Sequence, residues 1–254
     1  MKAKQFIVTA SMGKRIVAKG AVLHPDLRDV LRKGTLVIVA GSTNGYVAEE
    51  ILQSIGQAEG FSRAGFRRGT VVPPGFAGLK KADLKGDVVI TDGKWREGDR
   101  DKTVFDVAGS LKAGDVVLKG GNAVNLASGQ AAVYIGDPSS GTAGAILPVV
   151  YGRRVKLIVP IGLEKRVTDD IDTLASDIND TGTEGPRFMP LPGGILTELE
   201  AIKLLTGCKA RLAAGGGIYG AEGSVWLVVK GSDGELAAAE KLLDSVSQEP
   251  PCEV

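Results

Sequence analysis

The stretch that decides the fold is Thr35-Leu36-Val37-Ile38-Val39-Ala40-Gly41-Ser42-Thr43-Asn44-Gly45. It starts as an almost wholly apolar run rich in β-branched residues and ends in small residues. Residues 45–55 then show a helical pattern, with apolar side chains on one face. Because continuous apolar runs are typical of strands buried on both faces, we predict a parallel-sheet strand, a tight loop and a helix N-terminus in succession.

The same order of strand, small-residue loop and helix recurs later in the chain. Buried strands are predicted at residues 115–118 and 155–161, and the loop 136–142 leads into a predicted helix at 143–151. Three further strands are predicted at residues 5–11, 14–23 and 87–91. This repetition predicts an α/β fold with a mainly parallel sheet flanked by helices.

The composition changes near Thr168, where an acidic helical segment and a breaker-rich stretch follow each other. Beyond them the pattern predicts a helix at 197–205, strands at 209–214 and 224–230, and a helix at 234–246, with 188–191 able to supply a strand before them. This order is most of a ferredoxin-like unit. We therefore predict an α/β metabolite-binding domain at 1–182, a small C-terminal ferredoxin-like α+β domain at 183–248, and a tail at 249–254.

Composition narrows the class of protein. The 254 residues are 43% hydrophobic and 24% charged, as is ordinary for a soluble globular protein. The formal net charge is +1 and no basic run stands out, so we expect no nucleic-acid partner. No stretch approaches the ~20 apolar residues of a membrane helix, so we expect no membrane partner. With only Cys208 and Cys252, we expect reduced thiols and a cytoplasmic protein.

Motifs for common cofactors and metals are missing from the sequence. The acidic segment 169–180 lacks the spacing of a calcium loop, and a solvated helical face is the better interpretation. The run Gly215-Gly216-Gly217 falls inside a predicted hairpin, where no nucleotide-binding loop is expected. We therefore predict no cofactor and no metal site.

Three loops are candidates for binding an anion, and they are numbered in chain order: residues 41–44, 119–122 and 141–142. The first is Gly41-Ser42-Thr43-Asn44, where a helix N-terminus and free backbone N–H groups attract negative charge. The third is Gly141-Thr142, just before an apolar helix. The alternative interpretation is that Ser42, Thr43 or Thr142 is only a helix cap.

The second loop, Lys119-Gly120-Gly121-Asn122, ends a buried strand. Its lysine is therefore placed at the carboxyl edge of the sheet, where open α/β sheets bind ligands. Lys119 could neutralise a phosphate or carboxylate, or polarise a carbonyl, and the glycines allow close approach of the backbone. Lys165, after the last buried strand, could reach the same charge. Both lysines could instead be ordinary surface residues beside turns.

Asp92 directly follows a predicted strand and is the candidate general base. In an aldose–ketose isomerisation, Asp92 would move a proton while Lys119 stabilised the enediolate. The alternative is that Asp92-Gly93 is simply a turn dipeptide.

These motifs resemble the superfamily that groups ribose-5-phosphate isomerase, glucosamine-6-phosphate deaminase, CoA transferases, DeoR-type sugar-sensing domains and the regulatory subunits of translation initiation factor 2B. Gly41-Ser42-Thr43 resembles its phosphate loop, and Leu118-Lys119-Gly120-Gly121 followed by Ala123 resembles the Lys-Gly-Gly stretch of the isomerase. Gly141-Thr142 and the strand 158–165 also resemble family features. The resemblance covers about residues 30–166 and implies a small anionic ligand.

The sequence departs from the isomerase where acids are expected. Asp92-Gly93 is followed by Lys94-Trp95-Arg96, and Asn125-Leu126-Ala127 stand where a catalytic acid would follow the glycine-rich loop. The first hypothesis is therefore an enzyme or enzyme-like protein, an isomerase or transferase, for a phosphorylated or carboxylated metabolite. The second is a non-catalytic metabolite-binding or regulatory protein. A third is a subunit whose C-terminal domain makes homo-oligomer contacts.

Overall fold

The computed structural model describes residues 2–68, 71–72, 74–75 and 86–251. Within these residues it is a mixed α/β fold with eight α-helices and three sheets. The helices are α1 (Ala10–Leu23), α2 (Pro25–Arg32), α3 (Ser42–Ser54), α4 (Val104–Val107), α5 (Gly141–Arg153), α6 (Ile171–Ile178), α7 (Glu198–Thr206) and α8 (Asp233–Val246).

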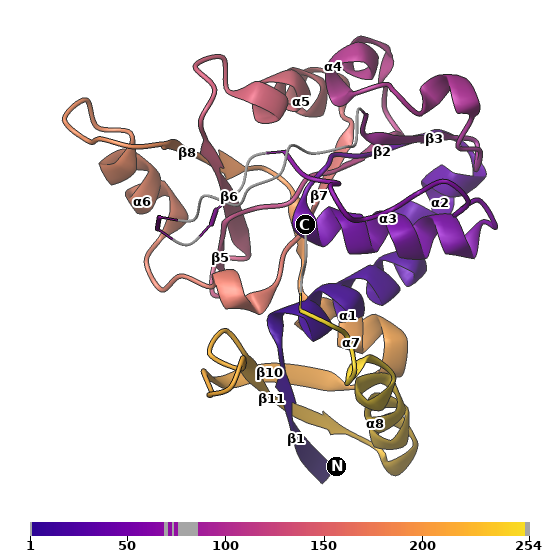
Figure 1. The fold of residues 1–254 in the computed structure, drawn as a ribbon, viewed down its shortest axis with the longest axis vertical. Helices are drawn as coiled ribbons and strands as arrows, with labels where there is room; N and C mark the ends of the chain where they lie inside the picture. The colour runs from indigo at the N-terminus through magenta and orange to yellow at the C-terminus, as the bar shows by residue number, and fades with distance from the viewer. Residues whose placement is uncertain (1, 69–70, 73, 76–85, 252–254) are drawn as a thin grey trace.

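The largest sheet has five strands in the order β3 (Val88–Thr91), β2 (Thr35–Ile38), β4 (Val116–Leu118), β7 (Lys156–Pro160) and β9 (Gly194–Leu196). The strands β2, β4, β7 and β9 are parallel, and β3 runs antiparallel to β2 at the edge. Helices α1, α2 and α3 lie on one side of this sheet and α4 and α5 on the other (Figure 1). The prediction of a mostly parallel sheet flanked by helices is confirmed.

Side chains of the central strands alternate between two separate cores. Leu36 and Ile38 pack into the core on the side of α1–α3, while Val37 and Val39 pack into the core that contains α4 and α5. All four are at most 2% exposed. Strand β2 is therefore buried on both faces, as its apolar run predicted.

Asn44 holds the start of α3 to the ends of two strands. Its side chain is fully buried, and its Nδ2 donates to the carbonyl oxygens of Val39 (2.7 Å) and Leu118 (3.1 Å). Buried backbone carbonyls need such partners, since leaving one unpaired costs about 1–3 kcal/mol. The amide thereby fixes the first loop against the second.

The side chain of Asp87 likewise holds separate segments together by hydrogen bonds, at the edge of the sheet. Its carboxylate is buried and accepts hydrogen bonds from the backbone N–H groups of Ala40 (2.8 Å) and Val104 (2.7 Å). The guanidinium of Arg68 donates to the same carboxylate from 3.0 and 3.1 Å. Because β3 is antiparallel, its first residues lie at the carboxyl edge of the parallel strands. Asp87 therefore joins three segments at that edge.

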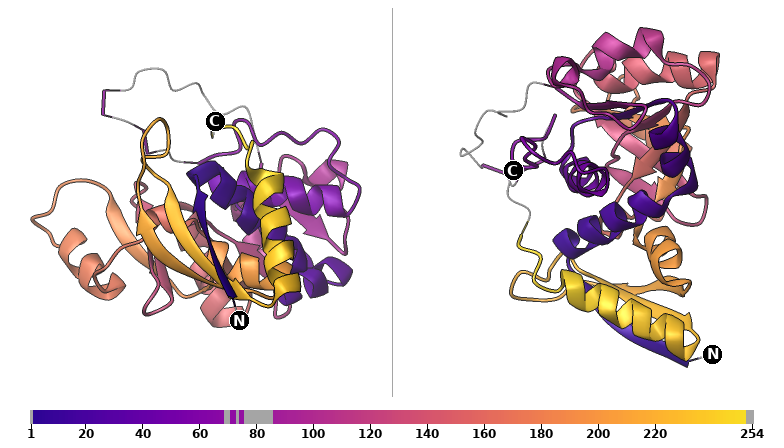
Figure 2. Two further views of the ribbon diagram at one scale, coloured as in Figure 1. Left: turned by 90° about the horizontal axis from the view of Figure 1, so that it is seen from below. Right: turned by 90° about the vertical axis from the view of Figure 1, so that its right-hand side faces the viewer.

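The second sheet joins the two ends of the chain. It has the order β1 (Lys2–Val8), β11 (Val225–Gly231) and β10 (Lys209–Gly215), with antiparallel pairing throughout. The helix α8 packs against one face of this sheet (Figure 2). Helix α1 continues from β1 into the larger sheet's core and contacts α7, so the first 23 residues contribute to both parts of the molecule.

The third sheet has the order β5 (Ala123–Asn125), β6 (Gln130–Ile135) and β8 (Arg187–Leu191), also antiparallel. Helix α6 covers it through a small core that includes Phe188 and Ile171. Residues 188–191 thus form a strand, but this strand and β9 pair with earlier strands and not with β10 or β11. The predicted domain division at residue 183 stays a prediction. Each of the three sheets pairs strands from before and after this position.

The prediction of a strand at residues 14–23 is wrong, because this segment belongs to α1. Thr9 caps the helix by accepting the N–H of Met12 (3.3 Å). The β-branched residues of the segment favoured a strand on local grounds. Tertiary packing overrides that preference, since Gly13 and Gly20 lie where a Cβ would collide with α7 residues.

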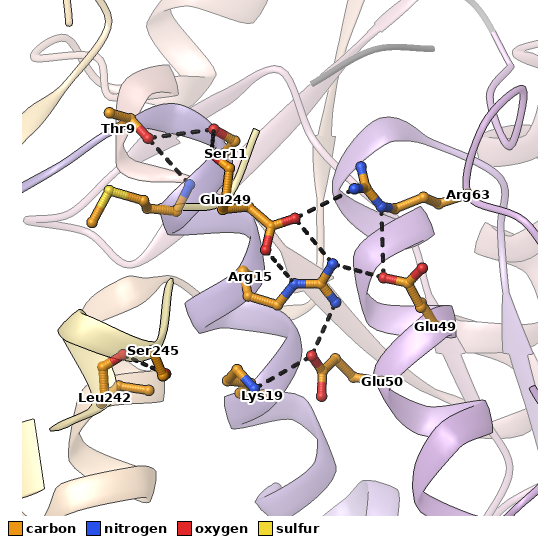
Figure 3. Close-up of polar contacts among 11 residues, drawn as sticks. Thr9, Ser11, Arg15, Lys19, Glu49, Glu50, Arg63, Leu242, Ser245 and Glu249 are labelled. Atoms are coloured by element: carbon orange, nitrogen blue, oxygen red, sulfur yellow. Dashed lines mark hydrogen bonds and ion pairs between the residues drawn. The ribbon is translucent and has the colours of Figure 1, made fainter. Parts of the chain in front are cut away.

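An ionic network ties the C-terminal end to α1 and α3 (Figure 3). The guanidinium of Arg15 pairs with Glu249 (2.9 Å) and Glu49 (2.7 Å), and Arg63 reaches the same two carboxylates from 3.4 and 3.6 Å. Both guanidiniums lie over the ring of Tyr46, with that of Arg15 at 4.8 Å and that of Arg63 at 4.3 Å from the ring centroid. Burial lowers the pKa of Arg15, but its hydrogen bonds to the carboxylates raise it above its ordinary value. The network anchors the segment that leads to Arg68.

No helix in the described part of the chain combines the length and apolar character needed to cross a membrane.

The contact between α1 and α7 depends on Gly20. A Cβ there would lie 2.7 Å from the Cα of Ala201, so Gly20→Ala must push the two helices apart. We expect a loss of about 1–3 kcal/mol in the free energy of unfolding, measured by urea denaturation. Gly152→Ala is the matched control, because this glycine is also helical and a Cβ there would meet nothing within 4 Å. It should gain up to about 1 kcal/mol. Equal effects of the two substitutions would contradict this account.

Candidate functional site

A cavity of about 690 Å³ opens at the carboxyl edge of the parallel strands. Its size suits a small metabolite. The loops after β2 and β4 and the start of α5 line it together, although they are far apart in the sequence. The cavity wall includes every residue that the sequence analysis selected for ligand binding: Gly41, Ser42, Thr43, Asn44, Gly120, Gly121, Asn122, Gly141, Thr142 and Lys165. Their role in binding stays a prediction, but the gathering of the three loops is a feature of the fold.

Lys119 also lines this cavity, at the end of β4. Its side chain is 9% exposed, and its backbone N–H donates to the carbonyl of Ile158 (3.1 Å). Across the residues that the structure describes, its ammonium makes no hydrogen bond and no ion pair. Burial lowers the pKa of Lys119 to about 8, with the charge of Asp87 acting to raise it and that of Arg68 to lower it. The cavity therefore contains a desolvated amine with spare donor capacity.

The N-terminus of α3 opens into the same cavity. Its N-cap is Gly41, and no side chain of the described residues caps the helix. Ser42 and Thr43 belong to the first helical turn, so the interpretation of either as the N-cap is wrong. Thr43 is 3% exposed, and its Oγ1 is buried with no hydrogen-bond partner among the described residues. Free N–H groups and an unpaired hydroxyl at a positive helix end are suited to an anion.

The N-terminus of α5 is less open to a ligand. Its N-cap is Ser140, with φ of 66°, so Thr142 is not the cap. The carboxylate of Asp137 accepts the N–H groups of Ser139 (2.7 Å) and Gly141 (3.3 Å). An acidic side chain thus already occupies part of the anion-accepting position, which makes α3 the better anion site of the two.

Gly121 and Asn122 mainly shape the wall. A Cβ at Gly121 would lie 2.9 Å from the carbonyl oxygen of Ala132, so only glycine fits between the loop and β6. The Oδ1 of Asn122 accepts the backbone N–H of Tyr134 (3.1 Å). The carbonyl of Gly121 accepts a hydrogen bond from Nζ of Lys165 (3.0 Å). These bonds hold Lys165 at the edge of the cavity.

The charged lining of the cavity is mostly basic. Among its described residues, Arg68, Lys119 and Lys165 are cationic and only Asp137 is anionic. The other wall carries apolar side chains that are open to solvent, including Phe105 (55% exposed) and Tyr134 (43% exposed). A ligand with an anionic group and a less polar remainder would match both parts of this lining.

Asp92 lies at the opposite edge of the sheet. Its Oδ1 accepts the N–H of Gly34 (3.0 Å), and its own N–H donates to the Gly34 carbonyl (2.9 Å). At about 3.3 Å per residue, the seven steps from Gly34 to Gly41 span about 23 Å. Since β3 is antiparallel, its end points away from the cavity, and Asp92 and Lys119 do not share a site. The turn interpretation of Asp92-Gly93 fits its backbone, with φ of 49°.

A buried acidic cluster lies behind Lys165 and was missed by sequence reasoning. Glu198, 1% exposed, accepts the N–H of Leu163 through both carboxylate oxygens (3.0 and 3.3 Å). Lys14 is also buried, and its Nζ lies 3.6 Å from Oε1 of Glu164. Burial, together with the charge of Glu164, raises the pKa of Glu198 to about 8. The cluster fixes the short 3-10 helix Leu163–Lys165 that carries Lys165 toward the cavity.

Asp87 and Arg68 were missed for a different reason. Each lies in an irregular or strand-edge context where one sequence gives no sign of a partner. Glu198 follows Thr197, whose capping box with Glu200 made the segment look like an ordinary helix start.

No group of three or more His, Cys, Asp or Glu side chains in the described ranges is arranged to hold a metal ion.

A scan against protein-family models, a search of curated proteins and a search of solved structures each returned no match to this chain.

Glu198 should make the stability fall as the pH rises. Its pKa is raised to about 8 in the folded state from 4.5, so the folded protein holds a proton that the unfolded chain loses. The wild type should lose stability between about pH 4.5 and pH 8, and Glu198→Gln should flatten that decline. Urea midpoints across this range measure it, with the exposed Glu222→Gln as control. A decline unchanged in Glu198→Gln would contradict the assignment.

Lys119 should lower the stability of the empty protein. Its folded pKa of about 8 lies below the ordinary lysine value of 10.5, so holding the charge penalises the folded state below pH 8, and the penalty fades toward pH 10.5. At pH 7, Lys119→Met should raise the free energy of unfolding by about 1–3 kcal/mol. Lys112→Met, at an exposed position, should change it by less than about 0.5 kcal/mol. Destabilisation by Lys119→Met would show that attraction to Asp87 outweighs desolvation.

Proposed function

We propose that this chain binds a small phosphorylated or carboxylated metabolite in the cavity at the carboxyl edge of its parallel sheet. The observation that carries the proposal is the N-terminus of α3, which opens into the cavity beside the Thr43 hydroxyl. Within the described residues this helix end has no side-chain cap and the hydroxyl has no hydrogen-bond partner. An anion there would receive charge-assisted hydrogen bonds from N–H groups that have no partner within the helix.

The basic lining supports the same ligand class. Lys119 and Lys165 add positive potential, and Arg68 contributes at the edge, although Asp87 neutralises much of its charge. A low-dielectric cavity strengthens each of these attractions relative to water. Phe105 and Tyr134 would contact the less polar part of the metabolite.

The proposal includes the resemblance to the superfamily of ribose-5-phosphate isomerase and CoA transferases. The order of the loop motifs supports it, and a sugar-phosphate isomerase or transferase reaction is what that resemblance implies. A small C-terminal α+β unit and assembly into homo-oligomers belong to the same proposal. A non-catalytic, regulatory role is the second candidate, and the position of Asp92 far from the cavity favours it.

A ligand screen tests binding. Sugar phosphates, nucleotides, CoA esters and small dicarboxylates are compared by thermal shift, in which a ligand stabilises according to its occupancy of the folded state. We expect at least one anion to raise the melting temperature of the wild type. Thr43→Val, which keeps the size but removes the hydroxyl, should weaken binding about 3- to 30-fold, because the anion loses a hydrogen bond.

The control is Thr183→Val, at an exposed threonine that is not part of the cavity wall, which should leave the affinity unchanged. A hit that Thr43→Val binds as tightly as the wild type would contradict the placement of the anion at α3. Turnover assays on the hit would then separate an enzyme from a binding protein.

A further inference from the structure

Lys119 differs from the other cations of the cavity in having no hydrogen-bond or ion-pair partner among the described residues. Lys165 donates to the Gly121 carbonyl, and Arg68 is paired with Asp87. Lys119 is 9% exposed and lines the cavity, and its amine makes no hydrogen bond or ion pair in the described part of the chain. A lysine whose only task was to hold a surface anion would not need this burial.

The surroundings of Lys119 favour its neutral form. The nearby carboxylate of Asp87 is already saturated by Arg68 and by the N–H groups of Ala40 and Val104. Arg68 repels a second positive charge at Lys119. Burial and a neighbouring cation are the two conditions that turn a lysine into a nucleophile. With its pKa lowered to about 8, about a quarter of the amine is neutral at pH 7.5.

The helix end beside it supplies the second requirement, which is positioning. If an anionic group is held at the N-terminus of α3, as the proposed function requires, the rest of the ligand lies in the cavity beside the amine. Holding two reacting groups together in this way replaces a bimolecular encounter by an intramolecular one.

We infer that Lys119 forms an imine with the carbonyl group of an anionic aldehyde or ketone bound in this cavity. The lone pair of the neutral amine attacks the carbonyl carbon, the C–N bond forms, and the carbonyl oxygen takes up a proton. The nitrogen loses its extra proton, and the carbinolamine then expels water to give the C=N bond. Amine plus carbonyl gives imine plus water, so no oxidant or reductant is needed. This inference rests on the proposed function and narrows its ligand to carbonyl-bearing anions.

The test is reductive trapping. The protein is incubated with glycolaldehyde phosphate and sodium cyanoborohydride, and the modified lysines are identified by peptide mass mapping. We expect Lys119 to react at least tenfold faster than any other lysine, Lys165 included, despite its burial. Inorganic phosphate should slow the reaction by competing for the α3 site, and glycolaldehyde without phosphate should react at least tenfold more slowly. The peptide map of the wild type gives this result without any variant.

Variants and pH sharpen the test. Lys119→Arg should abolish the fast adduct, while Lys112→Arg should leave its rate within twofold. The rate at Lys119 should rise with pH around an apparent pKa of about 8, set together with the facing groups Asp87, Arg68, Lys165 and Asp137. Adducts spread over lysines in order of exposure would overturn the inference.

A separate measurement keeps this inference distinct from anion binding. If inorganic phosphate or a sugar phosphate raises the melting temperature but Lys119 stays unmodified, the imine is refuted while the proposed function stands. If neither stabilisation nor labelling occurs, both are refuted.

Discussion

The burial of the central parallel strands on both faces is the constraint on which the rest of the structure depends. Side chains of β2, β4 and β7 alternate between two apolar cores, so these strands have no face on which to hold a polar ligand. Only their ends are free, and the parallel direction brings the carboxyl ends to one edge. The small-residue loops and Lys119 meet at that edge for this reason.

Buried polar groups then fix the edge in place. Asn44 holds two strand ends to α3, and Asp87 joins the ends of β2, α4 and the segment of Arg68. The carboxylate of Asp87 and the Nδ2 group of Asn44 both make good hydrogen bonds, so these side chains add rigidity and direction to a region that apolar packing alone would leave unspecified. Lys119 is the exception, since its amine stays desolvated and unpaired among the described residues. That contrast is why a ligand, and not the fold, explains it best.

The sequence allowed the buried strands and the three loops to be predicted, because apolar runs and small-residue turns are local signals. The sequence could not show at which edge of the sheet Asp92 lies, because the direction of β3 relative to β2 depends on strand pairing and not on composition. Part of helix α1 was predicted as a strand because its glycines are required by close packing against α7, and the local sequence does not show that contact. Asp87 and Glu198 find their partners through the tertiary fold, and a single sequence contains no sign of such pairs.

The central claim is that an anion binds at the N-terminus of α3, and NMR of the backbone amides tests it most directly. Titration with a sugar phosphate or inorganic phosphate should shift the amide signals of Ser42, Thr43 and Asn44 in a saturable way. The amides of Gly34 and Asp92, at the opposite edge, should not move. Saturable shifts confined to other parts of the chain, or none at the α3 residues at millimolar ligand, would contradict the account.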